Sequence, residues 1–305
     1  MGRPRVAFVA SGGGSKGLAH LGVLRAMEEL AHVPHVYVGT SAGAVAAAFV
    51  ASGLGTEALD GWARGGPRNA DALPSPLRTF FGAPSRRQLR SPGWLCSGLL
   101  SIDRFEGVLR ERLPMNDFRE LDRTLLVTAA DVDGRGRAVF GPGHRDDVPI
   151  SEAVAASCCI PMLYRPHRID GRYYVDGEIV RTLSLDLALE ARADVLIVSN
   201  VYRPHMPTPE EGTLAKRGAF AIGRQALNVV LSEKERRGID LVHQLHPHVQ
   251  VLNVSPDLGR FRFTSLREGR RLVRRGYREG LRVLASAKRR GVFDAAPNVH
   301  TVGQA

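Results

Sequence analysis

The chain has 305 residues, with 42 Lys or Arg against 31 Asp or Glu, so its formal net charge at pH 7 is +11. Its hydrophobic content of 44% suffices for a sizeable core, and 33 glycines with 18 prolines are too few for a collagen-like or disordered chain. The length allows two domains, but α/β folds often place more than about 200 residues in one domain. We therefore expect a single globular domain over residues 1–305.

Cysteine usage and the apolar segments indicate the compartment. Three cysteines, Cys96, Cys158 and Cys159, are too few for a disulfide framework, and adjacent cysteines bridge only with strain. The apolar run 6–10 is too short for the core of a signal peptide. The uncharged stretch 36–56 has the length of a membrane span, but its glycines and serines favour a buried strand, a turn and a helix. We expect a cytoplasmic protein.

Buried apolar strands alternate with amphipathic helices along the chain. The hydrophobic spacing predicts strands at 5–10, 35–38, 124–130, 194–200 and 248–254, a hairpin at 168–177, and helices at 17–30, 42–52, 101–113, 150–157, 184–192, 219–237 and 264–290. A turn is expected at Asp133-Gly134. This alternation is typical of the α/β class, with a mostly parallel sheet covered by helices on both faces, in three layers.

The expected core spans about residues 5–201. Residues 65–97 are rich in Gly, Pro, Ser and Arg, which predicts an irregular insertion or lid. Residues 203–305 form a C-terminal helical extension with a late strand. Its last helix, 264–290, carries apolar residues among many arginines, and we favour a solvated face packed on the sheet over a membrane-surface helix.

A candidate nucleophile lies in the pentapeptide Gly39-Thr-Ser-Ala-Gly43, which matches G-x-S-x-G. It stands between a predicted strand and a predicted helix, where a sharp turn exposes a serine above the edge of the sheet. Ser41 is therefore a candidate catalytic serine. A purely structural turn before a helix of small residues is the alternative.

A glycine loop, Gly12-Gly-Gly-Ser-Lys-Gly17, follows the first strand and opens the first helix. Successive backbone N–H groups in such a loop bind negative charge. The loop also fits G-x-G-x-x-G, but a dinucleotide site wants an acidic residue after the second strand, and Gly39-Thr-Ser stands there. We expect Gly12, Gly13 and Gly14 to form an oxyanion hole near Ser41. Lys16 either reinforces the field there or is solvated.

With these motifs in this order, the chain closely resembles the patatin-like phospholipase family. The stretches that carry the resemblance are SGGGSKGLAHLGVL, GTSAGA, Val175-Asp176-Gly177, LLVTAADVDGRG, AVAASCCIPMLYRP and DLALEARADVLIVSNV. The resemblance implies a three-layer patatin-like fold and an acyl hydrolase of lipid esters. It also implies a Ser/Asp dyad, with Ser41 as nucleophile and Asp176 as general base, and neither cofactor nor metal.

The loop after Asp176 departs from the family pattern. Glu178 stands where a second glycine is usual, and Arg181-Thr-Leu183 replaces a common Asn-Pro pair. A second carboxylate beside Asp176 could raise the pKa of Asp176 or point to solvent, and the sequence leaves both open. A catalytically silent relative that binds lipid or a partner is therefore the alternative function.

Histidines supply a rival scheme, a Ser/Asp/His triad that ends in His243, His246, His248 or His300. No signature supports it, nor does an acid or cysteine complete a metal site around them. His20 is expected to pack or to hydrogen-bond inside the first helix.

The charge of +11 serves solubility by default, with contact to anionic membranes as the sharper interpretation and no nucleic-acid partner expected. If such contact occurs, the segment 65–97, with Phe80, Phe81 and Trp94 beside arginines, is favoured over the basic helix 264–290 as the contact surface.

Overall fold

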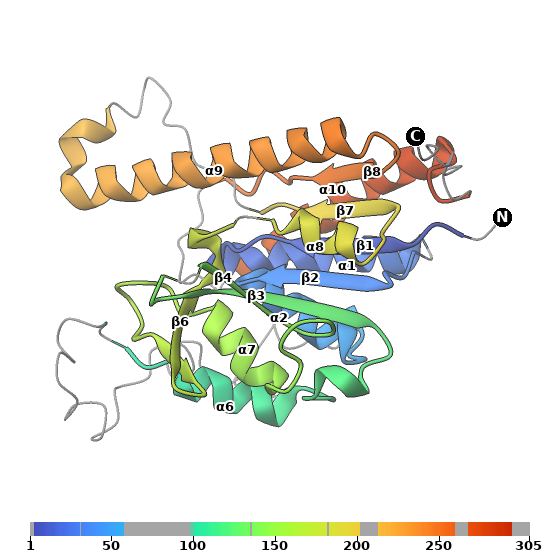
Figure 1. Ribbon diagram of the computed structural model, residues 1–305. Helices are drawn as coiled ribbons and strands as arrows, with labels where there is room; N and C mark the ends of the chain where they lie inside the picture. Colours follow the sequence, from blue (N-terminus) through green and yellow to red (C-terminus); the bar gives the residue numbers. More distant parts are fainter. Residues whose placement is uncertain are drawn as a thin grey trace, which may run out of the picture.

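The computed structural model describes residues 3–30, 32–57, 98, 100–134, 136–181, 183–201, 213–259 and 268–294. Strands β1 (Val6–Ala10), β2 (Val36–Thr40), β3 (Thr124–Asp131), β7 (Val195–Ser199) and β8 (Gln250–Val254) pair in parallel. β4 (Gly136–Phe140), β5 (His167–Ile169) and β6 (Arg172–Asp176) add antiparallel pairings. The eight-stranded sheet has the order β5-β6-β3-β2-β1-β7-β8, with β4 paired to β3 (Figure 1).

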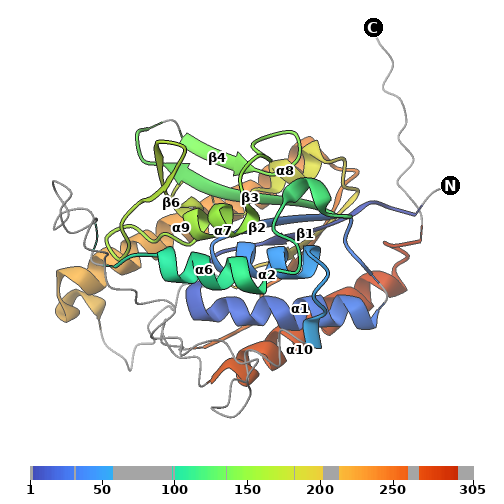
Figure 2. The same ribbon diagram turned by 90° about the horizontal axis from the view of Figure 1, so that it is seen from below.

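Helices cover both faces of this sheet. α1 (Leu18–Glu29), α2 (Ala42–Ala51), α6 (Asp103–Arg112), α7 (Ile150–Ser157) and α10 (Gly269–Arg289) lie on one side, and α8 (Leu185–Glu190) and α9 (Ala219–Leu245) lie on the other (Figures 1 and 2). Short 3₁₀ turns occur at η1 (Gly14–Gly17), η2 (Phe118–Glu120), η3 (Gly177–Ile179) and η5 (Leu214–Arg217). The mostly parallel three-layer α/β architecture that the sequence predicts is confirmed.

The alternation of side chains along the strands divides the core into two parts. Phe8 and Tyr37 pack with α1, α2 and α7, whereas Val9 and Val38 pack with α8 and α9. All four side chains are buried. Burial on both faces is the reason that the central strands are apolar at nearly every position.

Strand β3 brings the ends of β2 and β6 together. Residues 127–128 of β3 pair with both β2 and β4, and residues 129–131 pair with both β6 and β4. Because a strand has two edges, β2 and β6 lie along the same edge of β3, and β4 lies along the other. Thr40, the last residue of β2, is the register partner of Thr128, and Asp176, the last residue of β6, is the partner of Ala129. β2 and β6 therefore meet end to end on consecutive residues of β3.

The structure differs from the expected elements in two places. β4 was not predicted, because most of its residues are only half-buried; it follows the predicted turn at Asp133-Gly134. α9 continues to Leu245 rather than ending at 237, and ion pairs from Arg236 to Glu233 and to Asp240 bridge the expected end.

The last helix, for which the sequence favours packing on the sheet, contacts β8, the strand at the end of the sheet, and packs mainly on α1.

The uncharged stretch 36–56 folds into β2, α2 and the turns around them, as the sequence predicts. Among the helices that the structure describes, none has both the length and the apolarity of a membrane-spanning segment. The predicted insertion 65–97, together with Cys96 and His300, lies outside the described residues.

Candidate active site

Ser41 lies at the sharp turn between β2 and α2. Its backbone has φ 53° and ψ −123°, a conformation that non-glycine residues adopt at a cost of about 1–3 kcal/mol. The turn brings the first residues of α2 against the end of β1: a Cβ on Gly43 would lie 2.4 Å from the carbonyl oxygen of Ala10. Glycine is thus required at position 43, and the G-x-S-x-G pattern here reflects a real strand-to-helix elbow.

A buried serine of α7 holds this strained turn. The Ser41 backbone N–H donates to the Oγ of Ser157 at 2.7 Å, and that hydroxyl donates to the carbonyl oxygen of Thr128 at 2.7 Å. The hydroxyls of Thr40 and Thr128 also lie 2.7 Å apart. β2, β3 and α7 therefore fix the backbone of Ser41 together. Sequence reasoning did not single out Ser157, although a buried serine at the end of a helix of small residues marks it.

Asp176 meets Ser41 at the junction of β2 and β6. The Ser41 side chain lies within reach of the Asp176 carboxyl, which accepts the Glu178 backbone N–H at 3.0 Å. Asp176 is only 5% exposed, and this burial raises the pKa of its carboxyl to about 6, although the contacts with Glu178 N–H and with Ser41 both act to lower it. The structure thus brings together the two residues that the resemblance assigns as nucleophile and base.

The glycine loop lies between β1 and η1. Gly13 and Gly14 have φ 149° and φ 55°, which turns the backbone sharply before η1. The Gly12 backbone N–H donates to the Oε1 of Glu178 at 2.5 Å. Glu178 does not point to solvent, because it is 7% exposed and lies against this loop. Of the two alternatives that the sequence left open for Glu178, solvent exposure is therefore wrong.

His20 ties the glycine loop to β7. One ring nitrogen contacts the carbonyl oxygen of Ser11 at 2.8 Å and the other contacts the hydroxyl of Ser199 at 2.7 Å. Burial lowers the pKa of His20 to about 4, although the bond to Ser11 acts to raise it, so the ring is neutral at pH 7. The expected packing and hydrogen-bonding role of His20 is confirmed.

Lys16 is half-buried in η1, directly after the glycine loop. Burial lowers the pKa of its amine, and the charge of Asp257 acts in the opposite direction. Lys16 is therefore not a fully solvated surface residue.

Cys158 lies beside the nucleophile, a contact that its sequence position does not reveal. Its side chain lies within reach of that of Ser41, which acts to lower the pKa of the thiol. Burial, followed by the charge of Asp176, raises the pKa of the Cys158 thiol well above its usual value. The thiol is protonated at neutral pH and does not compete with Ser41 as a nucleophile.

The rival histidines lie at the other edge of the sheet. His246 and His248 come directly before β8, which runs parallel to β7, so they stand at the amino ends of the strands. Ser41 follows the carboxyl end of β2. His243, in the last turn of α9, lies near the same amino edge, so these three histidines and Ser41 stand at opposite edges of the sheet, which argues against a triad through any of them. Within the described ranges, no group of three potential metal ligands occurs.

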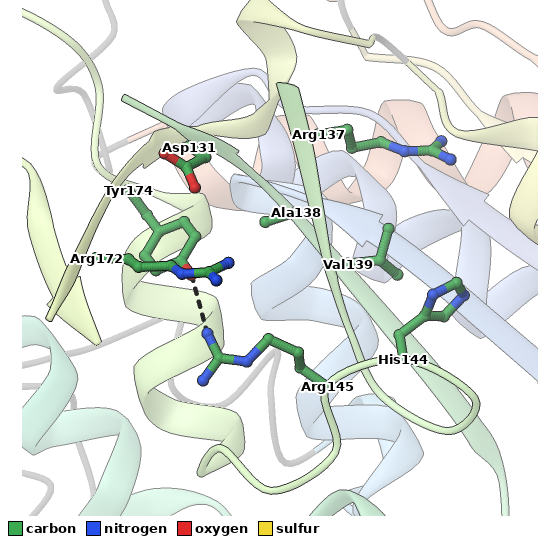
Figure 3. A pocket seen from close by; sticks show the side chains of 8 residues that line it. All are labelled: Asp131, Arg137, Ala138, Val139, His144, Arg145, Arg172 and Tyr174. Atoms are coloured by element: carbon green, nitrogen blue, oxygen red, sulfur yellow. Dashed lines mark hydrogen bonds between the residues drawn. The ribbon is translucent and has the colours of Figure 1, made fainter. Parts of the chain in front are cut away.

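A cleft of about 260 Å³ opens between β3, β4 and β6, lined by the side chains in Figure 3. Two of its three arginines are already engaged: Arg137 pairs with Asp186 at 2.7 Å, and Arg145 donates to Tyr174 at 2.9 Å and pairs with Asp170 at 2.6 Å. The lining includes neither Ser41 nor Asp176 nor the glycine loop. This cleft is separate from the candidate active site.

Comparisons with known proteins identify a family, related sequences and a similar fold. A family model for patatin-like phospholipases matches residues 8–189. Uncharacterised NTE family proteins of Mycobacterium bovis and Mycobacterium tuberculosis are 28% identical over 194 residues, which is 64% of this chain and 48% of theirs. The chain thus spans about half the length of these curated relatives. VipD from Legionella pneumophila has a similar fold, with a TM-score of 0.51 at 15% identity over 93% of this chain and 67% of that one.

Proposed function

Because the chain belongs to the patatin-like phospholipase family, we propose that it is a serine acyl hydrolase that cleaves acyl esters of lipids through a Ser/Asp dyad. The observation that carries this proposal is the juxtaposition of Ser41, on its strained elbow, with the buried carboxyl of Asp176, where β2 and β6 meet on consecutive residues of β3. The family membership supports the lipid-ester chemistry, and the contact supports the assignment of the two roles.

Acylation begins when the Ser41 Oγ attacks the carbonyl carbon of the ester and gives its proton to Asp176. The carbonyl oxygen becomes an oxyanion, for which the backbone N–H groups of Gly12, Gly13 and Gly14 are the proposed donors. Collapse breaks the bond to the alcohol oxygen, which takes the proton from Asp176. In deacylation, water gives a proton to Asp176 and attacks the acyl-serine, and the proton returns to Ser41 as the fatty acid leaves.

A base with a pKa near 6 suits this sequence of steps. At pH 7 Asp176 is mostly ionised and can accept a proton, and its raised pKa makes it a stronger base than an exposed aspartate. No histidine is needed to carry the proton, which agrees with the position of His243, His246 and His248 at the opposite edge of the sheet.

A fluorophosphonate probe tests the proposal directly. It should label Ser41, and Ser41→Ala should abolish both labelling and ester hydrolysis while the circular dichroism spectrum stays unchanged. Full activity in that variant, or labelling at another residue, would contradict the assignment. Absence of labelling together with tight lipid binding would instead favour a catalytically silent relative.

We further propose that the enzyme contacts anionic membranes peripherally, through the first half of α9. Two contacts fix the position of α9 on the sheet. Lys234 donates to the carbonyl oxygen of Ile179, in the loop that follows Asp176, and Asn200, which follows β7, donates to the carboxylate of Glu235. Since both contacts lie at the carboxyl edge of the sheet, the part of α9 before Lys234 continues past this edge by about 20 Å at 1.5 Å per residue. The helix extends beyond the body of the molecule in Figure 1.

The outward face of this half-helix is apolar. Ile222, Val229 and Val230 are 46%, 50% and 49% exposed, whereas Leu231 on the opposite face is buried. The segment 213–232 carries three basic residues and no acidic one. Exposed apolar side chains among positive charges match an anionic lipid surface. This surface differs from both segments that the sequence offered, of which 65–97 was favoured: that segment lies outside the described residues, and α10 uses its apolar side to cover α1.

A further inference from the structure

Glu178 connects the loop that follows Asp176 to the glycine loop, Gly12–Gly17. Its backbone follows Asp176 by two residues, and its carboxylate accepts the Gly12 N–H at 2.5 Å. The two residues are in close contact, because a Cβ on Gly12 would lie 2.7 Å from the Cγ of Glu178. A buried carboxylate is therefore bound to the loop that has to receive negative charge during the reaction.

The chemistry of this contact is competitive. An N–H group makes one strong hydrogen bond at a time, and a carboxylate is among the strongest acceptors in proteins. We infer that the Glu178 carboxylate occupies the anion-binding position of the glycine loop at rest, and that the oxyanion of a reacting ester must displace it from the Gly12 N–H. The inference rests on the proposed function, since it concerns the same reaction.

The fold does not need this carboxylate to hold the base. The Glu178 backbone N–H donates to Asp176 at 3.0 Å, and the N–H groups of Val180 and Arg181 both donate to the Gly177 carbonyl oxygen at 3.1 Å. All three bonds are made by the backbone and persist in any variant that shortens the side chain at position 178. Removing the carboxylate therefore frees the Gly12 amide and leaves Asp176 in place.

The Glu178 carboxylate could either compete with the oxyanion for the Gly12 N–H or hold Gly12 in position for catalysis, and the two roles predict opposite effects on rate. If the carboxylate competes, its removal raises the rate of every step that forms an oxyanion. If it instead positions Gly12 for catalysis, its removal lowers that rate. Burial raises the pKa of Asp176, and the contacts with the Glu178 backbone N–H and with Ser41 lower it; the side chain of Glu178 is not among these causes, so it does not set the pH profile.

The experiment compares the wild type with Glu178→Ala, with Glu178→Gln, which keeps the size and an uncharged acceptor, and with Val180→Ala as a matched control in the same turn. The rate constant for phosphonylation of Ser41 and kcat/KM for a soluble p-nitrophenyl ester should rise about tenfold in Glu178→Ala and less in Glu178→Gln. They should not change in Val180→Ala, and the midpoint of the pH profile should stay near 6 in all four proteins. Unchanged or lower rates in a folded Glu178→Ala would overturn the inference.

A second measurement does not depend on turnover. With ¹⁵N-glycine labelling, the Gly12 amide proton should resonate downfield in the wild type, move upfield in Glu178→Ala, and shift in the wild type once the phosphonate is bound to Ser41. A Gly12 resonance that is the same in wild type and Glu178→Ala would contradict the contact itself. Absence of Ser41 labelling in every variant would overturn the proposed function, and the displacement with it, whereas labelling with unchanged rates overturns only the displacement.

Discussion

At the scale of single residues, the proposed active site depends on groups that hold the backbone of Ser41 in a strained conformation. Its backbone N–H points at Ser157, and Ser157 in turn is held by the carbonyl oxygen of Thr128. A buried N–H that loses its only acceptor costs about 1–3 kcal/mol. The elbow is therefore stable only while α7 supplies that acceptor.

Ser157→Ala should lower kcat/KM by about tenfold to a hundredfold, because the turn relaxes and Ser41 moves relative to Asp176. Ser151→Ala is the matched control. Ser151 is another buried serine of α7, whose hydroxyl donates to Glu106 at 2.8 Å, away from the elbow. Urea unfolding and esterase kinetics should show that both variants lose stability and only Ser157→Ala loses activity. Equal kinetics in the two variants would refute the role of Ser157.

In the proposed mechanism, the pKa of Asp176 sets the pH dependence of the reaction. Because Asp176 must be ionised to take the proton of Ser41, kcat/KM should rise with pH and reach half its maximum near pH 6. Asp176→Asn should retain almost no activity at any pH, whereas single replacements of His243, His246 and His248 should each leave most of it. A profile with a midpoint near pH 4, as for an exposed carboxyl, would show that burial does not govern this group.

The raised pKa of Asp176 also makes the free energy of unfolding depend on pH: activity should rise with pH, whereas this contribution to stability falls. The pKa of Asp176 is 3.8 in the unfolded chain and about 6 in the folded one, so between these values the folded state binds more protons. Its stabilising contribution is fully present below pH 3.8 and is lost as the pH rises through 6. The loss is at most about 3 kcal/mol for a shift of about two units. Asp176→Asn should thus unfold at higher urea concentration than the wild type at pH 7.5, and a lower midpoint would contradict the shift.

At the scale of elements, α1 and α10 approach so closely that their backbones touch. A Cβ on Gly276 would lie 2.0 Å from the Ala19 carbonyl oxygen, and one on Gly22 would lie 2.0 Å from that of Val273. This contact explains why α10, despite its many arginines, is part of the core. Its buried residues Leu272, Val273 and Leu284 cover α1.

Gly276→Ala should therefore destabilise the protein by about 1–3 kcal/mol or more, since the added methyl group forces the two helices apart. Gly238→Ala, in α9, is the matched control because nothing lies within 4 Å of its added Cβ. It should stabilise the protein by about 0.5–1 kcal/mol through helix propensity. Opposite shifts of the urea midpoint are expected, and a shift of the same sign in both variants would argue against backbone contact.

The elements also show which features could be predicted from the sequence. The buried strands and the small-residue helix after Ser41 have strong local patterns, and the elbow motif marks Ser41. The role of Asp176 is implied only by the family resemblance, because Asp133-Gly134 and Asp170-Gly171 are Asp-Gly pairs as well. The contacts of Ser157 with Ser41 and of Glu178 with Gly12 join residues 116 and 166 positions apart. No local pattern encodes such a distance. β4 was missed for a different reason, because a half-exposed edge strand leaves no clear alternation of apolar and polar residues.

At the scale of the whole molecule, the apolar half of α9 and the catalytic edge face the same direction. Val229→Glu with Val230→Glu should weaken binding to vesicles of phosphatidylcholine and phosphatidylglycerol by about tenfold or more, because charge replaces apolar contact. Hydrolysis of a soluble ester should not change. Binding by the wild type should also weaken as salt rises.

The control for this experiment lies on the same helix. Leu241 and Leu245 are 52% and 64% exposed, yet they sit at the far end of α9 from the catalytic edge. Leu241→Glu with Leu245→Glu should leave vesicle binding intact. If both double variants bind vesicles equally well, the first half of α9 is not the membrane contact. A change in sedimentation mass for the variant at Val229 and Val230 would instead identify a dimer interface.

Because β2 and β6 meet end to end on β3, the place of an insertion in the chain decides whether Ser41 and Asp176 stay together. Ser41 and Asp176, the proposed nucleophile and base, stand at the ends of strands that do not pair with each other. The spacing between them is set by β3, through its consecutive residues Thr128 and Ala129. An extra residue early in β3 would carry β6 along with it and slide Asp176 about 3.3 Å past Ser41, more than the length of a hydrogen bond. The turn after β3, around Asp133-Gly134, carries no such constraint. We expect natural relatives to vary in length at that turn and to keep a fixed number of residues between the start of β3 and Thr128.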